Sequence, residues 1–484
     1  MNPLFLGLDI GTTGIKCVAF DENLSELAVA YREYDLHFGP ENAIEQDANE
    51  WLALSLDVIN EVINETRDLG ETRAIGISSQ GISFVPVNEN NEPMGLANTW
   101  FDARGNVSLP QMGAAISADE FKKRTGKPWL GKYVLPKLLM MRDRETERYE
   151  SAKAFYMPHE YVAGHLCGNF VTDHTMAGGT MLYNLSSRSW DEEIADTFGI
   201  PLDKLAPIQD SGTIAGKLNP ELKSKWDLNE EVLIALGGQD QKCASFAAGL
   251  NKGRLTLSLG TAAALHAVIT EPAVDLDSEI GTFAGIRSGQ WILEAAISTG
   301  GASLKWLRDL LAKKFSYDEL NDLAAPLLEE EPGLMFMPYL SRMNGMGSLT
   351  GLSLDSGAGA LAYAVMEGVA LEVNYYLIRM RELTSTAEAQ SMQFFGGGAT
   401  SPVWSQIMAD VTGLPIEVPV IHEAAAAGAA ILAGQAMGYF QDKEGQSFLP
   451  IKQQYQPNPQ RRVFYDEKMK KFIQARERLL AVEN

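Results

Sequence analysis

Cysteine, positive charge and long apolar runs are all scarce in this chain. Its three cysteines, Cys17, Cys167 and Cys243, lie far apart without CxxC spacing, so neither a disulfide framework nor a zinc knuckle is indicated. No window reaches about 18 uninterrupted apolar residues, and no basic segment precedes an apolar run at the start of the chain. We therefore expect a cytoplasmic protein that is not associated with a membrane.

The shortage of basic residues excludes a further class of partner. Lys and Arg number 40 against 63 Asp and Glu, so the formal net charge is -23, which repels nucleic acid unless basic residues cluster. The few basic runs, such as residues 122–124, lie in helix-like stretches and are typical of solvated helix faces. We expect no nucleic-acid partner, and an anionic nucleotide would need backbone amides and a metal ion to bind.

Two common nucleotide and metal motifs are also missing. The chain contains no GxxxxGK[ST] segment, which disfavours a Walker-type NTPase. His159, His165 and His174 are close in sequence but lack HExxH spacing, so they do not indicate a metal site.

What is present is a hairpin pattern that occurs twice. Residues 4–21 have the pattern strand, Gly/Thr turn, strand, and residues 254–270 repeat it about half the chain further on. The repeat indicates two similar lobes that face each other across a cleft. We place the boundary in the turn-rich segment 249–253, which gives domains of residues 1–250 and 251–484.

Helical and strand patterns alternate along both halves, which indicates an α/β fold. The expected helices cover residues 51–66, 360–383, 402–412 and an Ala-rich stretch at 423–437, and the expected strands cover residues 73–78, 231–236 and 392–395.

The two hairpin tips have the composition of phosphate-binding turns. Glycines such as Gly11 let backbone N–H groups approach phosphate oxygens, Thr12 and Thr13 add hydroxyl donors, and Asp9 could hold Mg²⁺ through water. The second tip has Gly260 and Thr261. A purely structural turn uses the same residues, so each tip alone leaves both interpretations open.

Asp240 follows a strand and a Gly-Gly turn, at the start of an expected helix. A carboxylate in that place is either a helix N-cap or a general base. Transfer of a phosphoryl group to a sugar hydroxyl needs one proton acceptor and otherwise mainly positioning and charge neutralisation. Gly397 and Gly398, between a strand and a helix, would let the backbone lie against adenine or simply form a tight turn.

A third segment has the composition of a sugar site. In an extended chain Trp100, Asp102 and Arg104 point to one side, which suits stacking on a sugar and paired hydrogen bonds to it. A surface ion pair beside a half-buried tryptophan is the alternative. Gln80 and Gly81 follow another strand end and could supply a second polar wall.

In this order the motifs resemble those of the FGGY family of carbohydrate kinases, within the actin-like ATPase superfamily, over nearly the whole chain. DIGTT resembles the first phosphate loop, SLGT the second, GGQD the catalytic-base segment and FFGGGATSPVWSQIMADVTGLPI the adenosine-binding stretch. EQDANEW, YVLPKLLMMRDRE and the SxGG stretch at 298–301 also match. The first family signature usually has Trp where Met140 stands, a departure that concerns packing rather than catalysis.

The resemblance implies an enzyme with two actin-like, ribonuclease H-like lobes that bind ATP, Mg²⁺ and a small sugar or polyol between them. It implies that Asp240 is the catalytic base, that Asp9 and Asp240 hold the metal, and that the protein is a possible homodimer. The implied cofactor-binding residues are Gly11, Thr12, Thr13, Lys16, Gly260, Thr261, Gly301, Gly397 and Gly398, and the implied substrate-binding residues are Gln80, Gly81, Trp100, Asp102 and Arg104.

The substrate is the point at which the resemblance divides. Xylulokinases have Gln-Met-His-Gly where this chain has Gln-Gly-Ile-Ser at 80–83, the Arg-Glu pair of glycerol kinases is absent, and Gln-Gly is more like L-xylulose and erythritol kinases. The loop after Ser341 lacks the usual Glu-Arg-Thr-Pro and is shortened. We expect phosphorylation of a ketopentose such as xylulose at a primary hydroxyl. The alternatives are another polyol, a hexulose or a linear signalling sugar, or a catalytically weak nucleotide-dependent sugar sensor.

Overall fold

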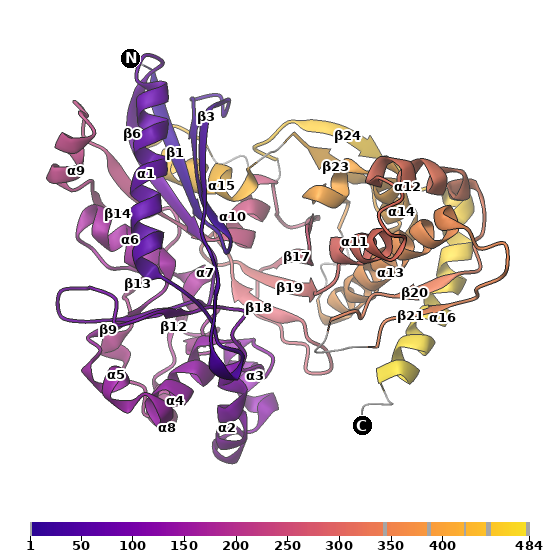
Figure 1. Cartoon of the computed structure of the whole chain (residues 1–484), viewed down its shortest axis with the longest axis horizontal. Coiled ribbons are helices and arrows are strands. Elements are labelled where there is room, and N and C mark those ends of the chain that lie inside the picture. The colour runs from indigo at the N-terminus through magenta and orange to yellow at the C-terminus, as the bar shows by residue number, and fades with distance from the viewer. Residues whose placement is uncertain (1, 342–345, 385–388, 421–422, 442–446, 481–484) are drawn as a thin grey trace.

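The computed structural model describes residues 2–341, 346–384, 389–420, 423–441 and 447–480. Figure 1 shows two α/β lobes side by side, one formed mostly by the first half of the chain and one mostly by the second. The shortened loop after Ser341 begins with residues 342–345, which lie outside the described residues. Within the described ranges, every helix is too short or too polar to cross a membrane.

The first lobe is built on a six-stranded sheet in the order β14-β15-β6-β1-β2-β3. β1, β2 and β3 form an antiparallel meander, while β6 and β15 run parallel to β1. The nearly unbroken apolar sequence of β1 is buried on both faces, as expected of a central strand. The strands are β1 Pro3–Ile10, β2 Gly14–Phe20, β3 Glu26–Glu33, β6 Glu71–Ser79, β14 Ile214–Lys217 and β15 Leu233–Gln239.

The second lobe repeats this order of strands. Its seven-stranded sheet runs β18-β19-β17-β16-β22-β23-β24, again with an antiparallel hairpin at the centre and two strands parallel to its first member. The shared order is ribonuclease H-like, so the predicted α/β fold with two actin-like lobes is confirmed. The strands are β16 Arg254–Leu259, β17 Ala263–Ile269, β18 Gly281–Ala284, β19 Trp291–Ile297, β22 Ser391–Phe395, β23 Ile416–Pro419 and β24 Ile451–Tyr455.

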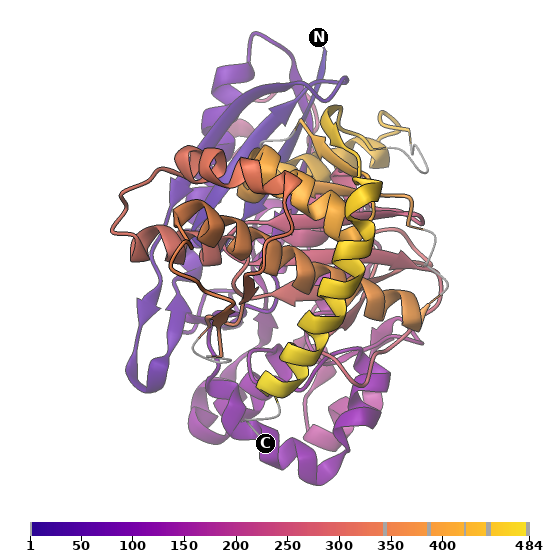
Figure 2. The same ribbon diagram turned by 90° about the vertical axis from the view of Figure 1, so that its right-hand side faces the viewer.

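Helices cover both sheets. The predicted helices at 51–66, 360–383, 402–412 and 423–437 are α1, α13, α14 and α15, with ends that differ by up to three residues. Figure 2 shows α16 lying across the outer side of the second lobe. The helices are α1 Ala48–Thr66, α2 Leu109–Ala115, α3 Ala118–Thr125, α4 Val134–Arg144, α5 Thr146–Ser151, α6 Pro158–Cys167, α7 His174–Ala177, α8 Glu192–Phe198, α9 Pro220–Lys225, α10 Asp240–Ala247, α11 Gly301–Leu310, α12 Tyr317–Ala324, α13 Ala358–Leu383, α14 Pro402–Thr412, α15 Ala424–Ala436 and α16 Arg462–Leu480.

Helix α15 belongs to the second half of the sequence but packs on the sheet of the first lobe, against β1, β6 and β15 (Figure 1). Small residues make this approach possible. A Cβ on Gly7 would lie 1.9 Å from the Ala426 carbonyl oxygen, and one on Gly76 would lie 2.0 Å from that of Ala429. The Ala-rich stretch is therefore used for tight packing.

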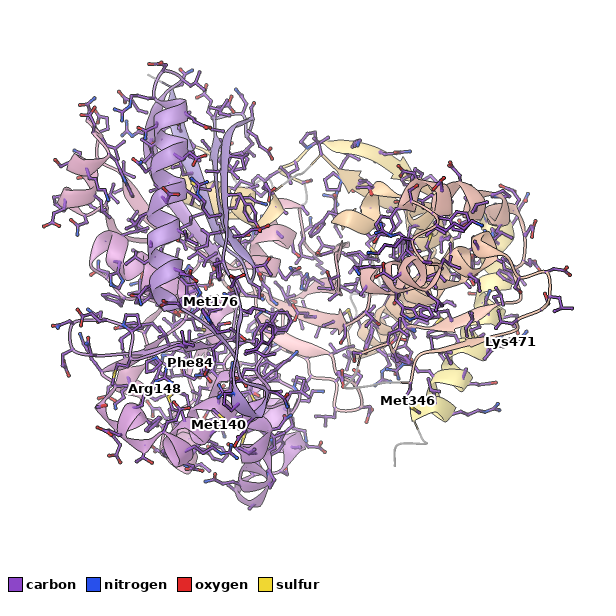
Figure 3. All side chains as sticks on the ribbon, in the orientation of Figure 1. Phe84, Met140, Arg148, Met176, Met346 and Lys471 are labelled. Atoms are coloured by element: carbon purple, nitrogen blue, oxygen red, sulfur yellow. The ribbon has the colours of Figure 1, made fainter. Side chains whose placement is uncertain are left out.

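Short strands and helices extend the first lobe below its sheet. Figure 3 labels Phe84, Met140, Arg148 and Met176 in this part. Met140 is 2% exposed in α4, so the position where the family usually has Trp is a core position. The small sheets are β4 His37–Phe38 with β5 Ile44–Gln46 and β8 Ala97–Asn98, β7 Val85–Val87 with β9 Ala154–Tyr156, β10 Thr172–Asp173 with β13 Ile208–Gln209, and β11 Tyr183–Asn184 with β12 Ser189–Trp190, while β20 Met335–Met337 pairs with β21 Ser348–Thr350 in the second lobe.

Candidate active site

The site begins where the parallel strands of the first lobe end. β1, β6 and β15 run in the same direction, so their carboxyl ends place Asp9, Ser78 and Asp240 at one edge of the sheet. Ser78 Oγ donates to Asp9 Oδ1 at 3.0 Å. Burial raises the pKa of Asp9 to about 6, although the Ser78 hydrogen bond and the Lys16 ammonium oppose the rise. Because burial disfavours the charged form of Asp9, a bound cation would stabilise its carboxylate.

Asp240 is the first residue of α10, and Gln239 occupies the N-cap position. Asp240 Oδ1 accepts the Gln241 N–H at 2.6 Å. Burial, together with the negative charge of Asp9, raises the pKa of Asp240 to about 7. Since a general base works best when its pKa lies near the working pH, this carboxylate is suited to proton abstraction, and it is not the N-cap that the sequence left as the alternative.

The backbone before Asp240 is held from below. The Gln239 N–H donates to Thr175 Oγ1 at 2.9 Å, and Thr175 Oγ1 in turn donates to the buried Asp173 Oδ2 at 2.8 Å. Gly238 passes so close that a Cβ there would lie 2.6 Å from Thr175 Oγ1. This chain of contacts fixes the direction in which α10 starts.

Helix α10 is also tied to the second lobe. Lys242 Nζ forms an ion pair with Glu294, whose Oε2 lies 2.8 Å from His266 Nε2, and His266 Nδ1 lies 2.7 Å from Ser245 Oγ. Burial lowers the pKa of His266, while Glu294 opposes that shift. The helix that carries the candidate base therefore contacts both lobes.

A ring of hydrogen bonds joins the first phosphate-loop candidate to the sugar candidates. Gln46 Nε2 donates to the Thr12 carbonyl oxygen at 2.6 Å, and Gln80 Nε2 donates to Gln46 Oε1 at 2.8 Å. Ser83 Oγ donates to Gln80 Oε1 at 3.2 Å and accepts the Trp100 N–H at 3.1 Å. Trp100 Nε1 closes the ring on Thr12 Oγ1 at 2.8 Å. The two predicted sites are thus one connected unit.

The ring changes what Gln80 can do. Its side chain is buried and both of its amide atoms are bonded within the ring, so it supports the wall of the site. Gly81 lies beside Gln239, the residue before Asp240, because a Cβ on Gly81 would be 3.0 Å from Gln239 Cγ. Trp100 is half-buried and stacks on Phe101 with ring centroids 3.8 Å apart, which leaves an aromatic surface at the site.

The expectation that Trp100, Asp102 and Arg104 point to one side of an extended segment is wrong. β8 ends at Asn98, and the Asp102 N–H donates to the Thr99 carbonyl oxygen at 3.1 Å, which forms a turn. Trp100 is therefore directed to Thr12, as described above. Asp102 is fully buried and forms an ion pair with Arg104 Nη2 at 2.6 Å, so the alternative of an ion pair beside a half-buried tryptophan is present, although it lies below the surface.

The second tip lies next to the SxGG stretch. The Gly301 N–H donates to the Gly260 carbonyl oxygen at 2.9 Å, and the Ala302 N–H donates to that of Thr261 at 3.0 Å. Both tip residues, Gly260 and Thr261, are exposed. Three residues predicted to contact the cofactor, Gly260, Thr261 and Gly301, are therefore brought together at the start of α11.

The predicted adenine segment borders the same tip. Gly396 has φ +88°, and a Cβ on Gly398 would lie 2.3 Å from Leu259 Cδ2, one residue before Gly260. A Cβ on Gly397 would meet nothing within 4 Å, so its backbone faces open space. The structure thus brings Gly397 and Gly398 to the second phosphate-loop candidate.

Lys16 of the first hairpin has a partner that sequence reasoning missed. Its Nζ lies 2.5 Å from Glu423 Oε2, and Glu423 immediately precedes α15. The side chains are about one quarter exposed, at 25% and 26%. Lys16 is therefore partly exposed and paired with a residue that is distant in sequence.

The acidic residues suit a magnesium ion. Asp9 and Asp240 offer carboxylate oxygens, and Asp9 raises the pKa of Asp240 because their negative charges repel. A divalent cation would relieve this repulsion. Within the described residues there is no group of three or more His, Cys, Asp or Glu side chains that could hold a metal. Two carboxylates with water and phosphate oxygens match the way Mg²⁺ is usually bound.

Gln46, Lys137 and Ile82 are further functional candidates that sequence reasoning missed. Gln46 lies in a matched motif, but only its contacts with Thr12 and Gln80 show its place in the ring. Lys137 stands out in the sequence as a lysine in the otherwise apolar run VLPKLLMM, a signal that could have identified it. Ile82 has φ +55°, a conformation that costs a β-branched residue about 1–3 kcal/mol.

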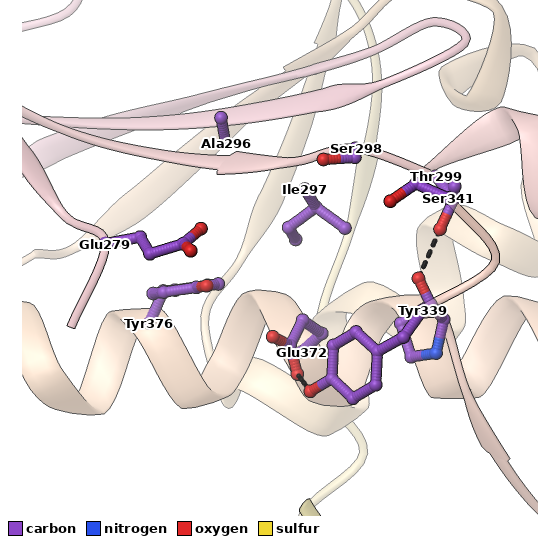
Figure 4. Close-up of a pocket in the computed structure, with 10 residues that line it drawn as sticks. Glu279, Ala296, Ile297, Ser298, Thr299, Tyr339, Ser341, Glu372 and Tyr376 are labelled. Atoms are coloured by element: carbon purple, nitrogen blue, oxygen red, sulfur yellow. Dashed lines mark hydrogen bonds between the residues drawn. The ribbon is translucent and has the colours of Figure 1, made fainter. Parts of the chain in front are cut away.

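A small hollow lies in the second lobe, where β19 leads into the SxGG stretch (Figure 4). It measures about 30 Å³ and is lined by residues that include Glu279, Ser298 and Tyr376. Tyr339 Oη donates to Glu372 Oε2 at its edge, at 2.6 Å. This volume suits one or two water molecules and is too small for a sugar or a nucleotide.

Two ribonuclease H-like lobes with paired Gly-Thr tips and a carboxylate base candidate between them define a phosphotransferase of the actin-like type. The profile of the FGGY family of carbohydrate kinases, N-terminal domain, matches residues 4–247, and that of the C-terminal domain matches residues 255–437. The chain belongs to the FGGY family of carbohydrate kinases. The predicted family and enzyme class are confirmed, and the protein is a sugar kinase.

Individual relatives agree with this assignment. The chain is 28% identical to a xylulose kinase of Staphylococcus epidermidis, over 96% of this chain and 95% of that protein. It is 27% identical to a gluconokinase of Bacillus subtilis, over 90% of this chain and 88% of that protein. The crystal structure of a xyloylose kinase from Brucella ovis has the same fold, with a TM-score of 0.91, 24% identity and coverage of 99% of this chain and 100% of that chain. ATP as phosphoryl donor and a small sugar or polyol as acceptor follow from the family.

Proposed function

We propose that this protein transfers the γ-phosphoryl group of ATP to a primary hydroxyl of a ketopentose such as xylulose, with Asp240 as the base. The observation that carries the proposal is the Asp240 carboxylate at the start of α10, whose pKa is raised to about 7 beside Asp9. At neutral pH such a group can take the hydroxyl proton as the oxygen attacks phosphorus.

The remaining residues bind and orient. Mg²⁺, when bound by Asp9 and Asp240 with water, would neutralise charge on the phosphates. Trp100 and Gly81 face the sugar, Gln80 supports that wall through the hydrogen-bond ring, and Asp102 and Arg104 brace the loop beneath it. The residues proposed to contact the nucleotide are Gly11, Thr12, Thr13, Lys16, Gly260, Thr261, Gly301, Gly397 and Gly398.

The ketopentose is favoured by the match to a xylulose kinase over nearly the whole of both chains. The segment 80–83 favours the second candidate, another polyol, a hexulose or a linear signalling sugar, because it lacks both the His of xylulokinases and the Arg-Glu pair of glycerol kinases. Asp9 and Asp240 are both present, at the carboxyl ends of parallel strands of the first sheet, which favours either kinase over a weakly catalytic sensor. A cytoplasmic location, a homodimer and the division at residue 250 stay predictions.

The test is ADP release by the purified full-length protein with Mg-ATP against ketopentoses, hexuloses, polyols and aldonates, each compared with a blank without sugar. We expect one ketopentose to stimulate ADP release at least tenfold over the blank, with a sugar phosphate as the product by mass. Stimulation by a different class would replace the ketopentose and leave the kinase. A flat panel with only slow hydrolysis would contradict the proposal and favour the sensor.

A further inference from the structure

Two loops of the first lobe face the sugar in the proposed reaction, residues 80–83 after β6 and residues 99–102 after β8. The first loop contains a residue in an unfavourable conformation, since Ile82 has φ +55°. The left-handed region is rare for β-branched residues, and such a conformation persists only where neighbouring groups hold it. Some contact outside the loop must therefore stabilise Ile82.

The contact is the side chain of Lys137, which reaches both loops from α4. Lys137 Nζ donates to the Ile82 carbonyl oxygen at 2.8 Å and to the Thr99 carbonyl oxygen at 2.8 Å. These acceptors lie 55 and 38 residues away from Lys137 in sequence. Thr99 immediately precedes Trp100, so the amino group of Lys137 is bonded to the backbone of both loops.

The setting of Lys137 argues against a role in packing alone. Its side chain is 0% exposed, and within the described part of the chain it forms no ion pair. Its neighbours in α4, such as Leu138 and Met140, are apolar and equally buried. Burying an amino group without a counter-ion is unfavourable unless its hydrogen bonds are made, so an apolar residue would serve packing better.

We infer that Lys137 is a positioning residue for the sugar site, which holds Ile82 in its left-handed conformation and fixes the Thr99 backbone so that Gln80 and Trp100 keep their places in the ring. This role rests on the proposed function, because the two loops are assigned to the sugar there. Lys137 does not touch the reacting atoms and acts only through the loops.

The protonation state of Lys137 does not decide this role. Burial lowers its pKa to about 7, with smaller downward contributions from Arg104 and Lys132 and an opposing one from Asp102. A neutral amine has two N–H donors and an ammonium group has three, so both carbonyl oxygens are served in either form. The effect of removing the side chain is therefore expected to be the same at pH 6 and pH 8.

The first experiment compares Lys137→Met with wild type in steady-state kinetics on the sugar that wild type uses. Methionine keeps most of the volume and removes the donors. We expect the KM for the sugar to rise at least tenfold at both pH values, while kcat and the KM for ATP change less than threefold. An unchanged KM for the sugar in a folded Lys137→Met protein would overturn the role.

Lys468→Met is the matched control. Lys468 is a lysine of the second lobe that is 6% exposed and donates to the Pro332 carbonyl oxygen at 2.7 Å. Its removal lowers stability as well, since Lys468 is also paired with the buried Glu367. We expect no change in the KM for the sugar. A rise equal to that of Lys137→Met would mean that general loss of stability is the cause, and would also overturn the role.

A second substitution tests the strain itself. Glycine adopts positive φ readily, so Ile82→Gly removes the need for a residue that holds this conformation. In the Lys137→Met background we expect Ile82→Gly to lower the KM for the sugar at least threefold relative to Lys137→Met alone. Additive losses in the double variant would contradict the inference.

Hydrogen exchange gives a readout that needs no substrate. In Lys137→Met we expect backbone amides of residues 80–83 and 97–102 to exchange about tenfold faster than in wild type, with no change in Lys468→Met. Equal protection in Lys137→Met and wild type would overturn the inference. If no tested sugar is phosphorylated, that result counts only against the proposed function, and the exchange measurement still decides the inference. If Lys137→Met does not fold, Lys137→Arg, which keeps N–H donors, is expected to fold and to show intermediate exchange. The role of Lys137 would be overturned if Lys137→Arg showed wild-type exchange and a wild-type KM for the sugar and a folded Lys137→Gln had that same KM.

Discussion

The two lobes share one order of strands and differ in what stands at the strand ends. In the first lobe, the tip at Thr12 is bonded through side chains to Gln46 and Trp100, with Asp9 and Asp240 beside it. In the second lobe, the tip at Gly260 and Thr261 is exposed and bonded through its backbone. The same fold thus carries a network of bonded side chains at one tip and an exposed turn at the other.

The difference separates two kinds of recognition. A sugar is distinguished by hydroxyl positions, which calls for side chains held in fixed places, whereas phosphates and adenine can be bound largely by backbone N–H groups and flat glycine surfaces. Substitutions in the first lobe should therefore affect chemistry and sugar binding, and those in the second lobe should affect ATP binding more mildly.

The largest effect is expected from Asp240→Asn. Removal of the base and of its charge should lower kcat at least about 10³-fold, because general bases contribute about 10²–10⁴-fold and the charge also attracts the metal. The KM for ATP should change less than about threefold. Steady-state ADP release checks both values.

Asp318→Asn is the control for this variant, since Asp318 stands in the first turn of α12 and is exposed. It should keep wild-type kinetics. Near-normal turnover in Asp240→Asn would remove Asp240 as the base and with it the main difference between the lobes.

A smaller effect is expected from Gln46→Leu, which breaks the hydrogen-bond ring. Gln46 itself is not proposed to contact the sugar or the nucleotide. The side chain of Gln46 is buried, donates to Thr12 and accepts from Gln80 and from Trp51 Nε1 at 3.2 Å. Leaving these groups unpaired should cost about 1–3 kcal/mol in the free energy of unfolding and raise the KM for sugar and for ATP together, by about tenfold. Urea unfolding and kinetics measure the two effects, with the exposed Gln453→Leu of the second lobe as control. A rise in only one KM would show that the ring does not couple the two sites.

The pH profile should show the Asp240 carboxyl. Because the base acts only when deprotonated and its pKa is raised to about 7, kcat/KM should fall about tenfold for each pH unit below about 6 and level off above 8. The pKa in the folded state exceeds the ordinary value of 3.8, so protonation stabilises the fold. That stabilisation is complete below pH 3.8 and is lost as the pH rises through about 7. Thermal unfolding of Asp240→Asn without nucleotide should lack this loss between pH 5 and pH 8; a profile identical to that of wild type would assign the titration to another group.

The smallest effect is expected at the open surface of the second lobe. Gly397→Ala adds a methyl group where nothing lies within 4 Å, so stability should change by less than about 0.5 kcal/mol. The KM for ATP should rise about threefold if adenine lies there, with the KM for sugar unchanged. Gly113→Ala in the first lobe, which is equally open, is the control. An unchanged KM for ATP would place adenine elsewhere.

Local patterns in the sequence sufficed for the main elements of the fold. The two hairpins and the helix Pro402–Thr412 stand where apolar runs, Gly-Thr turns and the Ser-Pro start of that helix predict them. The repeat of the hairpin also predicted two similar lobes. These features depend on neighbours in the chain, which a single sequence displays directly.

Contacts between distant residues could not be predicted in the same way. Gln46 and Gln80 are 34 residues apart, and Lys16 and Glu423 are 407 apart. An extended segment was expected at 99–102, but the chain forms a turn there. In this turn the Asp102 N–H is bonded to the Thr99 carbonyl oxygen and the Asp102 carboxylate is paired with Arg104. Such pairings are decided by how the elements pack, which the spacing of residues along the chain does not contain.

Helix α15 has a consequence for how the protein is made. Phe5, Val18 and Ala74 lie on the face of the first sheet that α15 covers, and they are buried in a cluster with Ala427 and Ile431. During synthesis α15 cannot cover this face until nearly the whole chain has left the ribosome. The amino-terminal half therefore cannot mature first and wait for the second. Both lobes become complete in the same late step. A truncated chain that ends before residue 424 would leave this apolar face exposed to chaperones and proteases.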